Sequence, residues 1–474
     1  MIFDLVIKNG NTYVDSEIKK LNVGVIDSNV VSLFDSDNYE ARSIIDAENQ
    51  FVLPGFIDVH FHVRSPSYPE RGTVETETRA AAAGGITAIF EMPIAKPCCS
   101  TLNIFAERKE HFTGRSFTNF GIYAAPGTKF KDGERPFSEV YEEDRDKILG
   151  FRDAGAIAFK IFMIEAPLGR EDEFDGLSIV DRGHLFHTLK LIKSTDLVST
   201  IHAECNDLLK YYQQILPEDE LNKPESHNLL RPPNVESTAI NEILYLNKFV
   251  DTKIHIAHLS SNEGLKVIRH YQSENCNVST ETCPHYLFYD DNAIKEFGNF
   301  AKINPPIRTS TDQDALWSGL KDDVISIIAS DHAAFCSYEK LATTRIDKVP
   351  PGHPGVNSLV YTMVDKVSKG EFTIQDIVKF YSSNPAERFG INHLMGSISP
   401  GLSANITILD MNKTHYYNSD QQFSHAKSSD VLYSGKKFNG KIDKTIVNGK
   451  VVYDGQTVLT EQVGRFINPN NKVL

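Results

Sequence analysis

The middle of the chain, from Phe56 to about residue 390, alternates short apolar runs with stretches of helical length. The apolar runs include ITAIFEM, AIAFKIFM, LVSTIHAE, KIHIAH, NVSTET and VISIIASD. Between them, TVETETRAAAAGG is typical of a helix that ends at Gly84-Gly85. This alternation predicts an α/β fold, a parallel (β/α)8 TIM-like barrel. A doubly wound open sheet is the alternative, but no glycine-rich phosphate loop follows the first strand.

The two ends of the chain have a different pattern, in which short β-type runs alternate with turns. DLVIKNG, LNVGVID and VVSLF lie near the start, and NITILDM and KTIVNGKVVYDG lie near the end, where Asn448-Gly449 predicts a hairpin turn. We therefore expect two domains. Residues 56–390 would form the barrel, and residues 1–55 and 391–474 would together form a small β-sandwich domain.

Composition restricts the possible partners and the compartment. The net charge is −14 and no basic cluster offsets it, which argues against a nucleic-acid partner. No run approaches the roughly 18 apolar residues of a membrane span, and the start MIFDLVIKNG lacks the layout of a signal peptide. The six cysteines form no CxxC pair and no disulfide framework. These features predict a cytoplasmic protein without a membrane or nucleic-acid partner.

The stretch Phe51–His62, FVLPGFIDVHFH, carries the first sign of chemistry. His60 and His62 are two residues apart in a predicted strand, so both imidazoles point to the same face. Two neutral imidazoles that converge in this way can form half of a site for a divalent transition metal. A histidine-rich strand edge without a metal is the alternative, so the interpretation depends on the other strands.

Further metal-compatible groups occur where other predicted strands end. His202 ends one strand, His258 ends the next, and Asp331 with His332 ends the last. The carboxyl ends of barrel strands carry the active site in this fold, so these groups are expected to meet. Lys160 lies in the apolar run AIAFKIFM, where a cation is costly and an ion pair is one explanation. The other is reaction of a neutral lysine with CO2 to give a carbamate, whose two oxygens can bridge two metals.

The set DVHFH, GAIAFKIF, IHAE, AHLS, ETCPHY and ASDHA resembles the cyclic-amide branch of the amidohydrolase superfamily. That branch includes dihydroorotases, allantoinases, hydantoinases and dihydropyrimidinases, and the resemblance covers nearly the whole chain. It implies a (β/α)8 barrel, a β-sandwich built from both termini, and a site for two divalent metal ions, usually Zn2+. By this resemblance one ion is bound by His60, His62 and Asp331, the other by His202 and His258, and N6-carboxylysine at Lys160 bridges them.

The resemblance also implies a hydrolase that opens a cyclic amide or ureide ring. A hydroxide that bridges the metals would attack the ring carbonyl, and Asp331 would act as the catalytic proton carrier. Asp58 and Glu281 are expected to support the metal ligands. Relatives are commonly dimers or tetramers, so a homodimer or homotetramer is expected. A non-catalytic dihydropyrimidinase-like scaffold is the alternative of another class, but such scaffolds lose metal ligands and this set is complete.

The substrate class is less sharply indicated. ETETRAAAAGGITAIFEMP, ETCPHY and AKINPPIR are most similar to allantoinases, which makes allantoinase-like activity the first expectation. Dihydroorotases share Arg64 and Asn304, but this chain has Ile94 and Phe335 where two further residues of their carboxylate clamp would lie. Hydantoinases and dihydropyrimidinases place a Tyr where Glu165 stands. Dihydroorotase and hydantoinase or dihydropyrimidinase activity therefore remain the alternatives.

Substrate contacts are carried over from the resemblance to five positions. They are Arg64, Asn304, Cys283, and Pro351 and Gly352 in the loop VPPGHPGV. That loop is expected to bind the ring through main-chain groups. We expect Arg64 to contact an anionic or carbonyl oxygen of the substrate, the alternative being a salt bridge at the surface.

Overall fold

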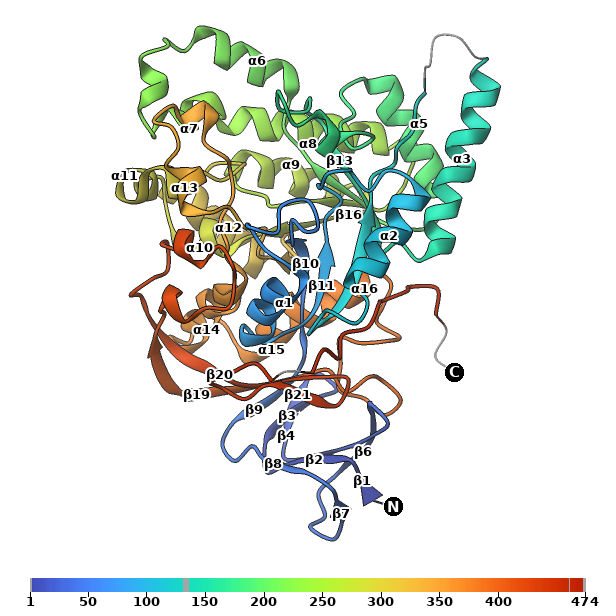
Figure 1. The fold of residues 1–474 in the computed structure, drawn as a ribbon, viewed down its shortest axis with the longest axis vertical. Coiled ribbons are helices and arrows are strands. Elements are labelled where there is room, and N and C mark those ends of the chain that lie inside the picture. The colour runs from blue at the N-terminus through green and yellow to red at the C-terminus, as the bar shows by residue number, and fades with distance from the viewer. Residues whose placement is uncertain (1, 131–135, 460, 472–474) are drawn as a thin grey trace.

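The computed structural model describes residues 2–130, 136–459 and 461–471. A barrel surrounded by helices forms the larger part of the molecule, and β-sheets lie at one end of it, on the side of the N-terminus (Figure 1). No helix in the described part of the chain has the length and apolar character needed to cross a membrane.

The barrel wall is a parallel sheet. Its strands are β10 (Phe56–His62), β11 (Ile86–Glu91), β12 (Asn119–Ala124), β13 (Ala158–Phe162), β14 (Ser199–His202), β15 (Ile254–Ile256), β16 (Val278–Thr282), β17 (Ile327–Ile328) and β18 (His332–Ala333). They follow the order β17-β16-β15-β14-β13-β12-β11-β10-β18. Because β17 and β18 belong to one chain segment, their pairing with β16 and β10 closes the sheet on itself. This confirms the predicted (β/α)8 barrel.

The last barrel strand is interrupted. The run VISIIASD suggested one strand that ends at Asp331, whereas the structure has β17, a break at residues 329–331, and then β18. In the break Ser330 donates its backbone N–H to Asp58 Oδ1 at 3.0 Å, and Asp331 has a left-handed backbone with φ 46°. The prediction of a continuous strand was wrong because Asp58 takes the hydrogen bond that a ladder neighbour would otherwise accept.

Helices cover the outside of the barrel. The longer ones are α1 (Val74–Ala83), α2 (Leu102–Phe112), α3 (Phe137–Ala154), α5 (Arg182–Lys193), α6 (Asn206–Ile215), α8 (Pro233–Asn247), α9 (Asn262–Ser273) and α12 (Ser310–Lys321). Shorter ones are α4 (Glu171–Phe174), α7 (Ser226–Leu230), α10 (Pro284–Phe288), α11 (Asn292–Phe297), α13 (Ser337–Lys340), α14 (Tyr361–Ser368), α15 (Ile374–Val378) and α16 (Asn384–Arg388). Helix α1 confirms the predicted one: Thr73 and Thr76 form a capping box at its start, and Gly84 ends it.

The remaining strands come from both ends of the chain. They are β1 (Ile2–Phe3), β2 (Leu5–Lys8), β3 (Asn11–Val14), β4 (Glu17–Lys19), β5 (Asn22–Ile26), β6 (Asn29–Phe34), β7 (Glu40–Ala41), β8 (Ile44–Asp46), β9 (Phe51–Pro54), β19 (Ile406–Tyr416), β20 (Lys437–Val447) and β21 (Lys450–Tyr453). One sheet has the order β21-β20-β19-β9-β3-β4 and another has the order β6-β5-β2-β8. The predicted sandwich of both termini is therefore present, and Asn448-Gly449 forms the predicted hairpin turn between β20 and β21.

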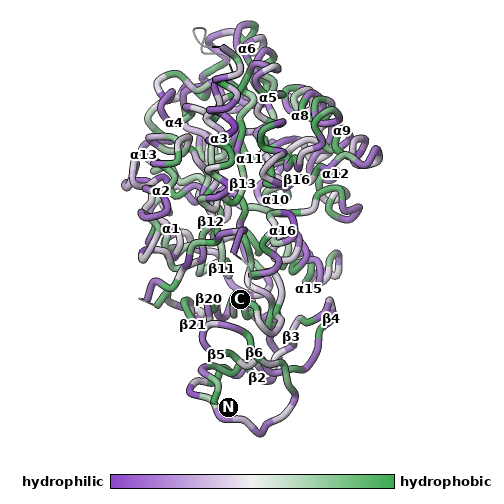
Figure 2. Tube along the Cα trace, turned by 90° about the vertical axis from the view of Figure 1, so that its right-hand side faces the viewer, coloured by the Kyte–Doolittle hydropathy of each residue, from purple (hydrophilic) through white to green (hydrophobic). Residues whose placement is uncertain are grey.

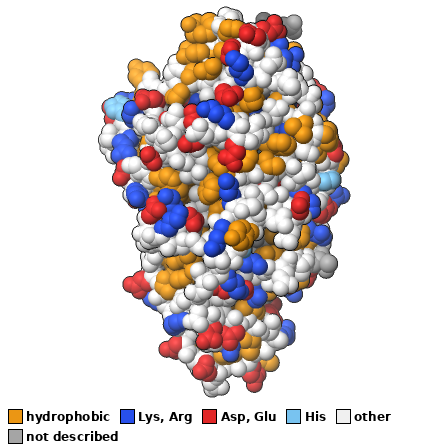
Figure 3. All heavy atoms as spheres, turned by 90° about the vertical axis from the view of Figure 1, so that its left-hand side faces the viewer, with side chains coloured by type: hydrophobic (Ala, Val, Ile, Leu, Met, Phe, Trp, Pro, Cys, Tyr) orange, Lys and Arg blue, Asp and Glu red, His pale blue; other side chains and the backbone are white. Residues whose placement is uncertain are grey.

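A hydrophobic core joins the two end segments. Leu5, Ile7 and Val23 from the N-terminal part pack in one cluster with Ile406 and Ile446 from the C-terminal part. Figure 2 shows the hydrophobic colour along β2 and β5. On the face drawn in Figure 3, acidic and basic side chains are intermixed. The domain limits 1–55, 56–390 and 391–474 stay a prediction, and residues 1 and 472–474 lie outside the described part.

Three buried carboxamides connect the barrel to the sandwich. Asn119 at the start of β12 donates from Nδ2 to Asn405 Oδ1 at 2.9 Å, and Asn448 donates from Nδ2 to Asn119 Oδ1 at 2.8 Å. We expect Asn119→Ala to lower the free energy of unfolding by about 2–4 kcal/mol, because it removes the buried hydrogen bonds that join Asn119 to Asn405, to Asn448 and to the backbone N–H of Arg465. Urea denaturation followed by the fluorescence of Trp317, the single tryptophan, measures this change. The exposed Asn412→Ala is the control, and a loss no larger than that of the control would contradict the prediction.

Candidate metal centre

His60, His62 and Asp331 converge at the carboxyl end of the barrel. His60 Nε2 lies 3.2 Å and His62 Nε2 lies 3.5 Å from Asp331 Oδ1. One possible ligand atom from each of the three residues lies within 4.8 Å of the other two. Strand β10 places both imidazoles on one face, and the break before β18 turns Asp331 toward them. The three residues can therefore hold a metal ion.

His202 and His258 form a second pair beside this group. His202 Nδ1 lies 2.9 Å from His258 Nε2, and the ring centroids of His258 and His60 are 5.2 Å apart. Phe162 stacks on His202 with centroids 4.3 Å apart and fixes the plane of that ring. His258 follows β15 with a left-handed backbone, φ 36°, which turns its side chain from the strand direction toward the pair. All four imidazoles thus lie in one cluster.

Lys160 is wholly buried in β13, next to this cluster. Its Nζ has no hydrogen-bond partner among the described residues and lies 5.3 Å from the centroid of the Phe162 ring. Burial lowers the pKa of the Lys160 ammonium, and the Glu281 and Asp331 carboxylates oppose that shift. An ion pair in contact with Lys160, the alternative raised by the sequence, is absent from the described residues. A buried amine of lowered pKa is suited to react with CO2.

Glu281, at the end of β16, orients the histidines. It accepts hydrogen bonds from His60 Nδ1, from His255 Nε2 at 3.0 Å and from the backbone N–H of His258 at 3.2 Å. Burial alone would raise the pKa of Glu281, but the adjacent His60 and His255 hold it well below the ordinary value. The expected supporting role of this carboxylate is consistent with these contacts. Its hydrogen bond to His60 Nδ1 leaves Nε2 free for a metal.

Glu204 supports His202 in the same way, and the sequence analysis missed it. Glu204 Oε2 lies 2.7 Å from His202 Nε2 and also accepts from the Arg231 guanidinium. The signal was available in IHAE, where Glu204 follows His202 by two residues. His332, which the sequence left without a role, bonds Glu77 through Nε2 at 2.8 Å and lies outside the cluster of possible ligands.

Nine of the eleven predicted site residues line one pocket. They are His60, His62, Arg64, His202, His258, Asn304, Asp331, Pro351 and Gly352. Lys160 and Cys283 are wholly buried and do not line it. The inner pocket has a volume of about 100 Å³, and it shares Arg170, Arg231 and Asn304 with an outer cavity of about 810 Å³. The structure therefore brings most of the candidates together, while their chemical roles remain predictions.

Arg64 lies in the pocket as an unpaired cation. It is 4% exposed, and its Nε and Nη1 have no partner among the described residues. Its guanidinium lies 5.0 Å from the centroid of the Phe335 ring, and its backbone is left-handed, φ 72°. Burial lowers the pKa of Arg64 to about 10, so the group is still charged at neutral pH. Arg64 is therefore not part of a salt bridge at the surface, which was the alternative raised by the sequence.

Part of the pocket lining is apolar. Ile94, Phe162, Ile164 and Phe174 form this apolar wall and belong to one hydrophobic cluster. Glu165, which stands where some relatives have Tyr, instead points into the outer cavity and pairs with Lys210. The sequence analysis did not find this wall, because only Phe162 lies at a strand end, whereas Ile94 and Ile164 lie in the segments after β11 and β13 and Phe174 lies in α4.

Comparison with known proteins gives consistent matches. The profile of the family described as "Amidohydrolase family" matches residues 51–452. An L-hydantoinase of Paenarthrobacter aurescens is 29% identical over 99% of both chains, and an allantoinase of Salmonella newport is 28% identical over 96% of both. Among solved structures, the L-hydantoinase (dihydropyrimidinase) from Arthrobacter aurescens has a TM-score of 0.90 at 28% identity, covering 98% of this chain and 100% of that one. A D-hydantoinase has a TM-score of 0.87 at 26% identity, covering 98% of each chain.

Proposed function

Because the chain belongs to the amidohydrolase family, we propose that it opens the ring of a cyclic amide or ureide by metal-dependent hydrolysis. The observation that carries this proposal is the convergence of His60, His62 and Asp331 in a pocket next to the buried Lys160. A scaffold protein would have no need of this costly cluster of buried polar groups.

We propose two divalent ions, with Zn2+ as the first candidate. His60, His62 and Asp331 would hold one ion, and His202 and His258 would hold the other. N6-carboxylysine at Lys160 would bridge them, which the unpaired and buried Nζ supports. Ions bound there would polarise the ring carbonyl and acidify a water molecule near neutral pH. The imidazole-rich donor set suits zinc.

The chain's own residues would orient the ring and move the proton. Arg64, Asn304 and the main chain at Gly352 would hold the oxygens of the ring. Water adds to the carbonyl carbon, the carbon–nitrogen bond breaks, and the Asp331 carboxylate passes a proton of the water to the leaving nitrogen. Glu281 and Glu204 would keep the imidazoles in place during the reaction, since each bonds a ring nitrogen.

We propose a hydantoin ring as the substrate core, with allantoin as the first candidate. The similarity to an allantoinase and to an L-hydantoinase supports this choice. Allantoin and hydantoin, after which the two enzymes are named, contain the same five-membered ring. A second candidate is a hydantoin with an apolar substituent, which the wall of Ile94, Phe162, Ile164 and Phe174 favours. A homodimer or homotetramer remains our proposal for the assembly.

A panel of ring-opening assays tests the function. With zinc-loaded protein we expect a kcat/KM for allantoin or 5-isopropylhydantoin at least ~10-fold above that for dihydroorotate and dihydrouracil, because the inner pocket is small and half apolar. The ratio of the first two rates decides between a polar and an apolar substituent. If no compound of the panel were opened faster than by Lys160→Met protein, the proposed function would be wrong.

Arg64→Met is expected to lower kcat/KM about 10- to 100-fold, because a charged hydrogen bond to a ring oxygen is lost. Zinc content should stay the same, since Arg64 is not among the possible metal ligands. Steady-state kinetics and metal analysis measure the two effects. Arg71→Met is the control, because Arg71 lines only the outer cavity and pairs with Glu339. Unchanged KM and kcat across the panel would remove the assigned role of Arg64.

A further inference from the structure

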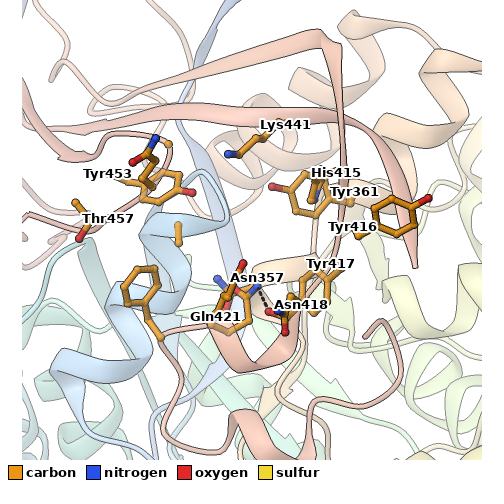
Figure 4. Close-up of a pocket in the computed structure, with 15 residues that line it drawn as sticks. Asn357, Tyr361, His415, Tyr416, Tyr417, Asn418, Gln421, Lys441, Tyr453 and Thr457 are labelled. Atoms are coloured by element: carbon orange, nitrogen blue, oxygen red, sulfur yellow. Dashed lines mark hydrogen bonds between the residues drawn. The ribbon is translucent and has the colours of Figure 1, made fainter. Parts of the chain in front are cut away.

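A second cavity, of about 540 Å³, lies where the barrel meets the terminal sheet, away from the metal centre. Asn357 and Tyr361 form its barrel side, and Lys441 and Tyr453 form its sheet side. Its lip is formed by five residues that follow β19, namely Tyr417, Asn418, Gln421, Gln422 and Phe423. Figure 4 shows Tyr453 and Lys441 across the cavity from Gln421 and Asn357. Its volume is in the range of small-molecule sites.

The lining has a distinct chemistry. Aromatic rings and carboxamides dominate it, and Lys441 is its one formally charged side chain. The rings belong to Tyr361, His415, Tyr416, Tyr417, Phe423 and Tyr453. The carboxamides belong to Asn357, Asn418, Gln421, Gln422 and Gln456. Aromatic faces favour a planar ring. Carboxamides donate and accept at once, which matches the edge of a ring amide. One cation and no carboxylate admit a ligand with at most one negative charge.

Several of these polar groups are available. In the described part of the chain no carboxylate lies within 4.0 Å of Lys441 Nζ, and no hydrogen bond engages the Gln421 or Gln456 side-chain amides. In contrast, Asn357 uses its Nδ2 to bond Ala80 O at 2.6 Å, which fixes the barrel side of the cavity. The cavity therefore combines a fixed wall with free donors and acceptors at its rim.

The lip continues into a segment that touches the catalytic loops. We call residues 417–430 the strap. His425 donates its backbone N–H to Glu77 at 2.9 Å, and Glu77 bonds His332, the neighbour of Asp331. Ser429 donates to Phe335 O at 2.6 Å, and Phe335 lies against Arg64. A ligand that shifts the strap can thus act on both Asp331 and Arg64.

We propose that this cavity is a second ligand site, for a planar heterocycle with ring amides and at most one negative charge. Binding there shifts the strap and, through its bonds to Glu77 and Phe335, changes turnover at the metal centre. The site is independent of the identity of the hydrolysed ring, because none of its lining residues touches the inner pocket.

Calorimetric titration of the zinc-loaded protein with uracil and with orotate tests the site. We expect a saturable site that persists in Arg64→Met protein and weakens at least tenfold in Lys441→Met and Gln421→Ala proteins. Orotate should bind more tightly than uracil in the wild type, and Lys441→Met should remove that difference. Exposed residues outside the cavity provide the matched controls Lys437→Met and Gln375→Ala, which should bind as the wild type does.

Turnover at saturating substrate tests the coupling, because saturation suppresses competition at the metal centre. We expect either probe to change kcat at least twofold in the wild type and not in Lys441→Met protein. Loss of all binding in Arg64→Met protein, or absence of saturable binding up to the solubility limit, would overturn the site. Binding without a change in kcat would overturn the coupling. A changed sedimentation coefficient of Tyr416→Ala protein would show that a second copy fills the cavity instead.

Discussion

Replacing Lys160 with methionine is expected to lower kcat/KM for every substrate at least ~10³-fold, which corresponds to about 4 kcal/mol of transition-state stabilisation. Methionine has a similar length but cannot form a carbamate, so the proposed bridge between the ions is lost. Zinc content should fall as well. The fold should remain, because Lys160 Nζ makes no hydrogen bond among the described residues. Kinetics, metal analysis and thermal unfolding of the same preparation measure these effects.

The control for this variant is Lys210→Met, which removes a lysine from the outer cavity and leaves Lys160 intact. A useful further test is rescue by short carboxylic acids, whose two oxygens could occupy the place of the carbamate. If Lys160→Met protein kept its zinc and more than a tenth of its activity, a carbamate bridge would not be required.

Asp331→Asn is expected to reduce kcat about 10⁴-fold, or about 5.5 kcal/mol. The amide keeps the shape of the side chain but neither carries a proton nor ligates an ion as a carboxylate does. Kinetics with added zinc separates the two losses, because excess metal can restore occupancy but not the proton carrier. The matched control is Asp144→Asn, which changes another buried carboxylate, one that bonds His187 far from the pocket. Activity of Asp331→Asn protein restored to the wild-type level by zinc would exclude the proton-carrying role.

Strand ends made the fold and most of the site predictable from the sequence. Alternating runs over the middle of the chain indicated the barrel, and a polar residue at the end of each run indicated the rim. His60, His62 and His202 are such residues, and the structure places them together. Lys160 was found because a lysine inside an apolar strand violates the usual pattern of burial.

Features that depend on contacts distant in sequence escaped prediction. Strand β12 was not recognised, because its run NFGIYA contains Asn and Gly, which are uncommon in strands. The strand is buried because the surrounding elements cover it. The interruption before β18 depends on Asp58, which lies 272 positions away from Ser330. The apolar wall depends partly on Ile94 and Ile164, which lie in loops, and loops have no regular sequence period.

Three pocket residues have left-handed backbones, which sequence cannot reveal. Arg64, His258 and Asp331 have φ between 36° and 72°, a region that costs a residue other than glycine roughly 1–2 kcal/mol. Such strain persists where surrounding contacts over-determine the backbone, and it is concentrated at functional sites. Here it turns each side chain out of its strand direction and into the pocket.

The sharing of one sheet by both chain ends also has a consequence for the order of synthesis. Strand β9 ends at Pro54, and its partner β19 begins at Ile406, so about 350 residues must be translated between them. At a translation rate of about 5–20 residues per second, the edge of β9 that pairs with β19 stays unpaired for roughly 20–70 s during synthesis. During that time the edge can pair with another nascent chain. In a chain truncated before Ile406 this edge of β9 would stay unpaired. We therefore expect chaperones and proteases to bind such a truncated product.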